Sequence, residues 1–397
     1  MQRRRRRSYC GRRMEEDPMR ESEDKVLWIW LRLVTEGNVR WMNALYETLG
    51  SVQDIYKTTD EEYIAMGVGE HIRRRLNNKD LKQAYDIFGI CEKFGIGMVD
   101  ITDAAYPELL RHITAPPCLL FYDGRFAEAF SHPTLTVIGT RHSTASGEAS
   151  AAEFARGLAA SGFTVVCGVA DGIEQIIHRS VMEIDGRCVQ VLPCGLLKAG
   201  KRVAHMIRDT VVHGAVVTEC LPNEVRRFDA YPLRNRILSG LSHGTLVIQA
   251  PKKSGAIMTA GYAAEQGRDV FVLPGSVRDP SYSGNNALLV DGAHPVIAYD
   301  DLVDFYQEKF PEDIREVDRR DETFETFLSS VTESAPREFE NEEQQAIYSV
   351  LSDGAHFVEE VMRQTGLTAQ QVFVELSRME FYGWIEALPG GTFKTIS

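Results

Sequence analysis

The sequence predicts an α/β protein with a parallel sheet at its centre, a small helical domain before it and a winged-helix domain after it. Short β-branched runs alternate with helical stretches between residues 135 and 299. This rhythm is typical of repeated strand–helix–strand units, whose right-handed crossovers build a sheet covered on both faces. Hydrophobic residues make up 44% and charged residues 25% of the chain, as in ordinary globular proteins.

Six runs of the central region are the expected strands. In a parallel sheet of this kind, ligands bind beyond the carboxyl ends of the strands, where loops lead into the N-termini of helices. We therefore expect a functional site in the loops that follow these runs. The runs are residues 135–138, 164–167, 189–192, 215–218, 245–249 and 270–273.

The chain before the sheet reads as helical. From Glu23 to about Phe94, apolar residues recur at three- and four-residue steps, which predicts four or five short helices. Such a cluster fits a protein-interaction or packing module of the SAM type, and it also fits a nucleic-acid-binding helix-hairpin-helix. Residues 1–13 hold seven arginines and no acid, so we expect a disordered basic tail over residues 1–22.

The chain after the sheet predicts an acidic linker and a winged helix. Three helices at 342–351, 357–364 and 369–379 are followed by two short strands with a Pro-Gly-Gly turn between them. The third helix carries more acids than bases, which favours a protein contact at least as much as DNA. The expected domains are residues 1–22, 23–104, 105–307, 308–340 and 341–397.

Charge and cysteine content exclude some classes of protein. The net charge of −13 excludes an evenly basic DNA coat but leaves room for a local basic cleft. The seven cysteines contain no CxxC pair, so the sequence signals neither a disulfide framework nor a zinc site. The longest strongly apolar stretch, residues 26–34, is too short to span a bilayer. We therefore expect a cytoplasmic protein with no membrane partner and no metal or cofactor.

The loop after the first strand has the composition of a phosphate site. Gly139 lets the backbone approach a ligand, and Thr140 and Thr144 offer hydroxyl groups. The following helix N-terminus presents free N–H groups, and the Arg141 guanidinium can grip phosphate in two places.

The next two loops resemble catalytic motifs only in part. Gly168 lies in the second loop, and Glu174 and His178 one helical turn apart could form an acid–base pair. Because no nucleophile accompanies them, a structural hydrogen bond between the two is favoured. Residues 195–202 nearly match a P-loop, but Arg202 stands where that motif needs the hydroxyl that binds magnesium.

Cations and aromatic rings alternate between residues 226 and 236. Four arginines, Arg227 among them, share this stretch with Phe228 and Tyr231. Arginines bind phosphates and rings stack on unpaired bases, a combination that suits single strands but also occurs in protein interfaces. A further loop, residues 252–259, adds lysines and hydroxyl groups at the same sheet edge, so the ligand is expected to carry several phosphates.

These motifs, in order and spacing, resemble the DNA processing protein A (DprA/Smf) family. The most specific is Tyr-Pro-Leu-Arg-Asn-Arg-Ile-Leu-Ser-Gly-Leu-Ser at 231–242. The resemblance implies an extended Rossmann-like core and a non-catalytic, homodimeric protein that binds single-stranded DNA. It also implies protection of incoming DNA and help in loading the recombinase RecA during natural transformation. The expected DNA-binding residues are Gly139, Thr140, Arg141, Thr144, Gly168, Arg227, Tyr231, Arg234, Asn235, Arg236, Ser254, Gly255 and Thr259.

The chain departs from the family pattern at two places. Phe228 stands where the family has a DNA-binding lysine, so either Arg227 takes that role or affinity is reduced. The family's Tyr-Pro after the third strand is replaced by residues 199–201. Two alternatives stay open: a Rossmann-like nucleotide (phosphoribo)hydrolase and a protein-binding adaptor. The hydrolase loop is missing, because the chain's Pro-Gly-Gly at 389–391 lies in the winged-helix region.

Overall fold

The computed structural model divides the chain into two compact units, residues 1–317 and 318–397. Among the described helices, none combines the length and apolarity needed to cross a membrane. The described residues are 18–226, 230–315, 341–352, 354, 356–381, 384–388 and 392–395.

Six helices form the first part of unit 1, rather than the four or five expected. Side-chain caps separate consecutive helices: Asn38, Ser51 and Thr59 each accept a hydrogen bond from a backbone N–H of the helix that follows. Thr59 and Glu62 form a reciprocal capping box, which starts a new helix directly after the previous one. The helices are α1 (Pro18–Val34), α2 (Val39–Leu49), α3 (Val52–Lys57), α4 (Asp60–Ala65), α5 (Glu70–Leu76) and α6 (Lys82–Phe94).

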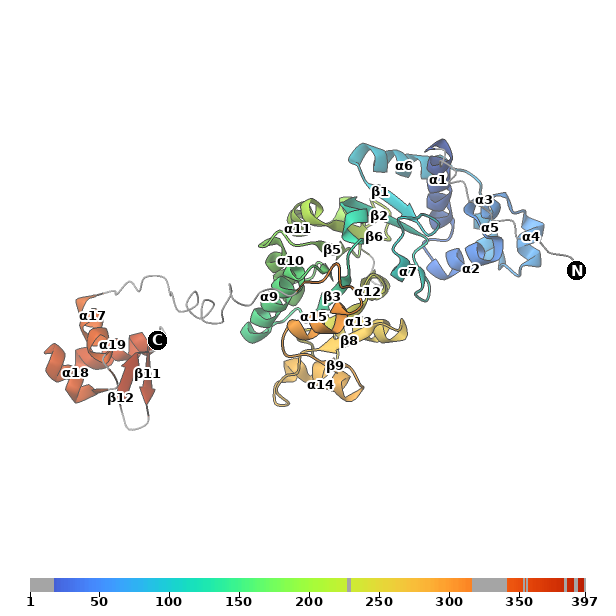
Figure 1. The fold of residues 1–397 in the computed structure, drawn as a ribbon. Helices are drawn as coiled ribbons and strands as arrows, with labels where there is room; N and C mark the ends of the chain where they lie inside the picture. Colours follow the sequence, from blue (N-terminus) through green and yellow to red (C-terminus); the bar gives the residue numbers. More distant parts are fainter. Residues whose placement is uncertain are drawn as a thin grey trace, which may run out of the picture. The chain divides into compact units, whose positions relative to one another are not determined.

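A sheet of nine strands follows, in the order β1-β2-β6-β5-β4-β3-β7-β8-β9 (Figure 1). The six expected runs are β3 to β8, each within two residues of its predicted bounds, and all pair in parallel as predicted. Three strands are unexpected: β1 and β2 add an antiparallel extension beyond β6, and β9 pairs in parallel with β8 at the other edge. The strands are β1 (Gly97–Asp100), β2 (Leu119–Gly124), β3 (Thr134–Ile138), β4 (Thr164–Cys167), β5 (Cys188–Val191), β6 (Ala215–Thr218), β7 (Gly244–Val247), β8 (Asp269–Val272) and β9 (His294–Pro295).

The strand order has a topological switch point at the carboxyl end of β3. The chain adds β4, β5 and β6 on one side of β3, then returns to add β7 and β8 on the other side. Loops that diverge at such a switch point leave room for a ligand. The helices of this region are α7 (Glu108–Arg111), α8 (Phe126–Ala129), α9 (Ala145–Ala160), α10 (Ile173–Met182), α11 (Lys201–His213), α12 (Ala230–Gly240), α13 (Gly255–Glu265), α14 (Ser283–Val290) and α15 (Asp300–Gln307), with 3-10 turns η1 (Leu196–Lys198) and η2 (Pro280–Tyr282).

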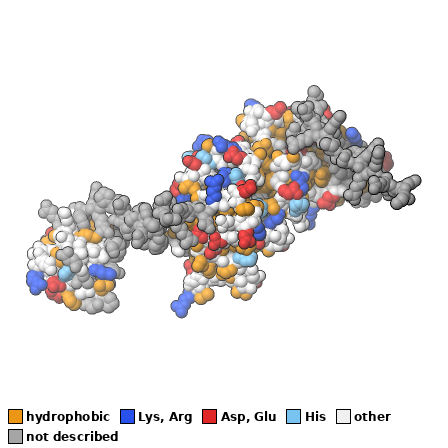
Figure 2. Space-filling model, in the orientation of Figure 1, with side chains coloured by type: hydrophobic (Ala, Val, Ile, Leu, Met, Phe, Trp, Pro, Cys, Tyr) orange, Lys and Arg blue, Asp and Glu red, His pale blue; other side chains and the backbone are white. Residues whose placement is uncertain are grey.

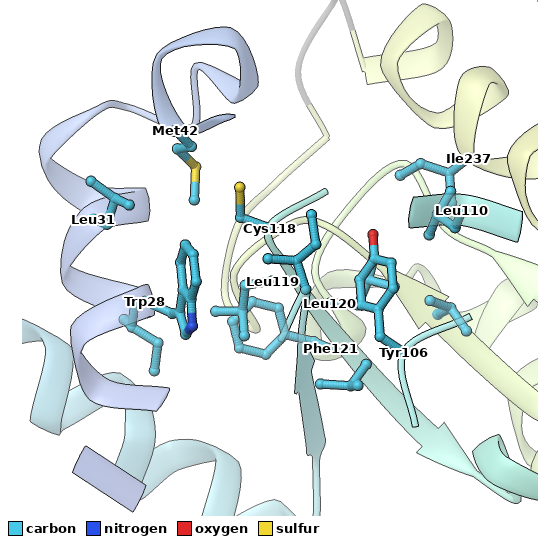
Figure 3. Packing of buried hydrophobic residues seen from close by; sticks show 14 of the residues in the cluster. Trp28, Leu31, Met42, Tyr106, Leu110, Cys118, Leu119, Leu120, Phe121 and Ile237 are labelled. Carbon is cyan, nitrogen blue, oxygen red and sulfur yellow. The ribbon is translucent and has the colours of Figure 1, made fainter. Parts of the chain in front are cut away.

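One apolar cluster joins the N-terminal helices to the sheet. Trp28 and Leu31 of α1 lie on the side of β2 that carries Leu119 and Phe121, and Ile237 of α12 belongs to the same cluster (Figure 3). One face of β2 is therefore covered by helices that precede the sheet in sequence. Because α12 shares this core, its position depends on the helical segment as well as on the strands.

Unit 2 has the expected winged-helix outline. In its described residues, three helices are followed by a two-stranded wing, and a short additional strand, β10, pairs with β12. Glu375 of the third helix is buried and accepts a hydrogen bond from Gln344 Nε2 at 2.7 Å. The elements are α17 (Glu342–Leu351), β10 (His356–Phe357), α18 (Val358–Thr365), α19 (Ala369–Phe381), β11 (Ile385–Leu388) and β12 (Thr392–Thr395).

Asn285 ties α14 to the sheet edge. Its side chain is fully buried; Nδ2 donates to the carbonyls of Ile248 and Leu273, both at 2.9 Å, and Oδ1 accepts from Ala250 N at 2.7 Å. The side chain therefore replaces the strand pairing that β7 and β8 lose where they diverge.

Asn285→Ala should lower the free energy of unfolding by about 2 to 4 kcal/mol, because it leaves several buried backbone groups without partners. Urea denaturation followed by tryptophan fluorescence measures this loss. Asn223→Ala, at an exposed position, should change stability little. Equal stability of the two variants would contradict the role given to Asn285.

Candidate nucleic-acid interface

Helix α12 carries two buried arginines. Arg234 is 4% and Arg236 6% exposed. Arg236 Nη2 donates to both carboxylate oxygens of Glu219 at 2.8 Å, and Arg234 Nη1 lies 3.7 Å from Glu174 Oε1. A guanidinium can be buried only where carboxylates or hydrogen bonds compensate it, so these pairs fix the helix over the strand ends.

Two elements bring the carboxylates to α12. Glu219 follows the last residue of β6, and Glu174 lies in the first turn of α10, after the β4 loop. Gly168 in that loop leaves the space the ion pair needs, since a Cβ there would overlap Arg234 Nη1 and Glu174 Oε2. The need for a residue without a side chain at this position is therefore steric.

Tyr231 lies at the start of α12 among three guanidinium groups. The Cζ atom lies 4.7 Å from the ring centroid in Arg141, 5.5 Å in Arg226 and 5.6 Å in Arg234. Arg226 Nη1 also donates to Tyr231 Oη at 2.9 Å. The ring is half-buried, whereas Arg141 and Arg226 are exposed. Cations from three separate segments thus surround one aromatic ring at the distances of cation–π contacts.

The loop after β3 is held by hydrogen bonds that orient Arg141. Thr140 N donates to Gln249 O at 2.7 Å, and Gln249 Nε2 donates to Thr144 Oγ1 at 2.9 Å. Thr144 Oγ1 accepts a further bond from Gly147 N at 3.1 Å and so caps α9. Thr140 and Thr144 therefore shape the loop, and Arg141 is the side chain that the loop presents.

The loop after β7 is positioned in a similar way. Ser254 caps α13, and Asn235 Nδ2 donates to Gly255 O at 3.3 Å. Thr259 Oγ1 donates to the same carbonyl at 3.0 Å and is buried. Asn235 and Thr259 thus link α12 to α13, while Gly255 stays exposed at the sheet edge.

The structure brings the predicted residues together in two layers. Arg141 and Tyr231 lie at the surface, whereas Arg234, Asn235 and Arg236 lie beneath them. Arg227 is outside the described residues. Sequence reasoning missed Glu219 and Gln249, each of which follows or ends a predicted strand. An isolated polar residue directly after an apolar strand is the signal that could have found both.

The expected hydrogen bond between Glu174 and His178 is absent from the described residues, a correction to that expectation. Glu174 Oε2 accepts from Ala170 N at 2.9 Å, and His178 Nε2 lies 3.0 Å from Thr210 Oγ1 on α11. Burial lowers the pKa of His178. Each group has a better partner than the other, so they do not form an acid–base pair. Within the described ranges, no group of three or more His, Cys, Asp or Glu could hold a metal ion.

Gly168→Ala should destabilise the protein by about 2 to 4 kcal/mol, because the added methyl group displaces the Arg234–Glu174 pair. The matched control is Gly261→Ala in α13, where a Cβ meets nothing within 4 Å. That change should stabilise the helix by about 0.5 to 1 kcal/mol. Thermal unfolding measures both; a similar gain for the two variants would contradict the packing described.

Two family models match this chain, one in each compact unit. The family model for DNA recombination-mediator protein A matches residues 97–307, and that for the DprA winged helix domain matches residues 331–391. The chain is similar to the DNA processing protein DprA of Bacillus subtilis, with 32% identity over 54% of this chain and 73% of the relative. It is also 30% identical to the protein Smf of Escherichia coli, over 72% of this chain and 74% of that protein.

Among solved structures, the DNA processing protein A of Streptococcus pneumoniae is similar, with a TM-score of 0.57 and 25% identity. The likeness covers 72% of this chain and 96% of that one. The first family model covers more than half of the chain, including the strands of the large sheet and the buried arginines of α12. The second covers most of the winged helix. The chain belongs to the DNA recombination-mediator protein A (DprA/Smf) family.

Proposed function

We propose that this recombination mediator binds single-stranded DNA at the Tyr231 site and acts without catalysing a reaction on it. The observation that carries the proposal is the set of three guanidinium groups around one half-buried ring. Arginines bind backbone phosphates, and an aromatic ring stacks on an unpaired base. In this proposal the exposed Arg141 and Arg226 bind phosphates, and the ring of Tyr231 stacks on a base.

The site favours single strands over duplex DNA for a physical reason. A base can stack on Tyr231 only if it has left its own stack, which costs much less in a flexible single strand than in a paired duplex. The net charge of −13 also weakens indiscriminate attraction to the more highly charged duplex. Specificity for single strands therefore rests on the ring, and affinity rests on the arginines.

The remaining parts of the proposal rest on the family resemblance. They are loading of a RecA-type recombinase, protection of incoming DNA in the cytoplasm, and assembly into a homodimer. Sedimentation of the purified chain would test dimer formation, and strand exchange by RecA on coated DNA would test loading.

Two alternative functions have direct tests. A nucleotide hydrolase would release free base from nucleoside monophosphates, and any turnover would overturn a purely binding role. A protein-binding adaptor would show no affinity for DNA at any salt concentration.

Arg141→Ala should weaken binding of oligo-dT by about 1 to 3 kcal/mol, because a charge-assisted phosphate contact is lost. The slope of log affinity against log salt should also become shallower by about 0.7, the value of one contact in a single strand. Fluorescence anisotropy at several salt concentrations measures both quantities. Arg74→Ala, on exposed α5, is the control that should bind like the unmodified chain. Unchanged binding by a folded Arg141→Ala protein would rule out this site.

Tyr231→Phe and Tyr231→Ala should separate stacking from hydrogen bonding. The Phe variant keeps the ring and loses only the bond from Arg226, so affinity should fall slightly. The Ala variant loses the stacking surface and should lose about 1 to 3 kcal/mol. Titration with single-stranded and duplex DNA measures the preference for single strands, which should shrink only in the Ala variant. An equal loss in both variants would show that the hydroxyl group, and not the ring, matters.

A further inference from the structure

Helix α11 presents a cationic face to solvent next to the Tyr231 site. Lys201 and Arg208 are exposed and seven residues apart, so they lie on the same side of the helix. The opposite side carries the buried Thr210 and packs against the sheet through Val203 and Ile207. The burial pattern thus fixes which side of α11 faces outwards.

The charges on this face are not neutralised as those on neighbouring helices are. Arg156 of α9 and Arg179 of α10 both pair with Glu183, at 3.3 and 3.6 Å. Within the described residues, by contrast, neither Lys201 nor Arg208 has a carboxylate within 4.0 Å. Figure 2 shows Lys and Arg side chains over the α10 and α11 side of the core, among scattered acids.

The acid on α11 itself is already engaged. Asp209 Oδ2 lies 2.9 Å from His205 Nδ1 on the same helix. The carboxylate of Asp209 is thus engaged within the helix, and residues 201–208, which contain Lys201, Arg202 and Arg208 and no acid, carry an excess of positive charge. Lys198, exposed in the turn that precedes α11, extends this excess towards the strand ends.

The face is continuous with the Tyr231 site. Arg202, in the first turn of α11, forms an ion pair with Asp171 of the β4 loop, which lies next to the β3 loop that carries Arg141. On the other side, Gly195 N donates to Glu224 O at 2.9 Å, which joins the loop before α11 to the segment that ends in Arg226. The start of α11 therefore lies between two segments that supply arginines to the site.

We infer that single-stranded DNA leaving the Tyr231 site continues along α11, with its phosphates bound by Lys198, Lys201 and Arg208. The inference rests on the proposed function and extends it from one pocket to a track. A polyanion fits this face better than a protein partner, because protein interfaces are depleted in lysine and have an apolar centre. The exposed apolar residue of the face, Val212, lies near the far end of the helix.

The track can be tested by the length of DNA bound. The variant Lys201→Glu/Arg208→Glu is compared with Lys57→Glu/Lys93→Glu, which makes the same change in net charge at exposed positions of α3 and α6. Oligo-dT of about 6 nucleotides, enough for the Tyr231 site, should bind both variants like the unmodified chain. Oligo-dT of about 25 nucleotides should bind the α11 variant about tenfold more weakly. Its salt slope should be shallower by about 1.4, the value of two contacts.

The outcomes separate this inference from the proposed function. Unchanged affinity of the α11 variant for the longer strand would overturn the track alone. So would an equal loss for both lengths, or a loss matched by the α3/α6 control, since either reflects general repulsion. Arg141→Ala should weaken both lengths alike. Failure of the unmodified chain to bind either strand would overturn the proposed function and the track with it.

Discussion

The site depends on burial of two guanidinium groups under the start of α12. Arg234 and Arg236 can lie in the interior only because Glu174 and Glu219 reach them from the loops after β4 and β6. Those loops leave the sheet on the same edge, so the two pairs hold α12 across it. Tyr231 begins this helix, and its position among the arginines follows from the pairs beneath it.

This arrangement lowers the stability of the fold but fixes the direction of α12. Several nitrogens of the two buried guanidinium groups, Nε and Nη1 of each, have no hydrogen-bond partner among the described residues. An apolar helix would cover the strand ends at lower cost. It would not fix the direction of α12 as closely, because charge pairs require particular partners whereas apolar contacts accept many. The ring of Tyr231 is thus positioned by buried ion pairs in which it takes no part itself.

The sequence alone predicts much of this structure, and the gaps have physical causes. Strands β3 to β8 are predictable because strands buried on both faces are continuous apolar runs. The bounds of β1 could not be predicted, because Gly97–Asp100 is only four residues long, follows a helix and ends in a charged residue. Arg141 and Tyr231 are predictable from their types and places. The structural roles of the Asn235 and Thr259 side chains could not be predicted from the sequence. Their shared partner, the Gly255 carbonyl, is a backbone group that only the tertiary structure brings close to Asn235.

Because of the apolar cluster between α1 and β2, the part of the chain that matches the family model is not expected to fold independently of the helices before it. The family match begins at residue 97, yet Leu119 and Phe121 of β2 are covered by Trp28 and Leu31, which precede that point (Figure 3). A chain shortened to the matched residues would expose this apolar patch and is expected to aggregate. Since Ile237 belongs to the same cluster, truncation would also loosen the helix that carries Tyr231. The N-terminal helices are therefore part of the DNA-binding unit in a mechanical sense, and Arg32 of α1 also pairs with Glu224, at 2.9 Å, in the segment that ends in Arg226.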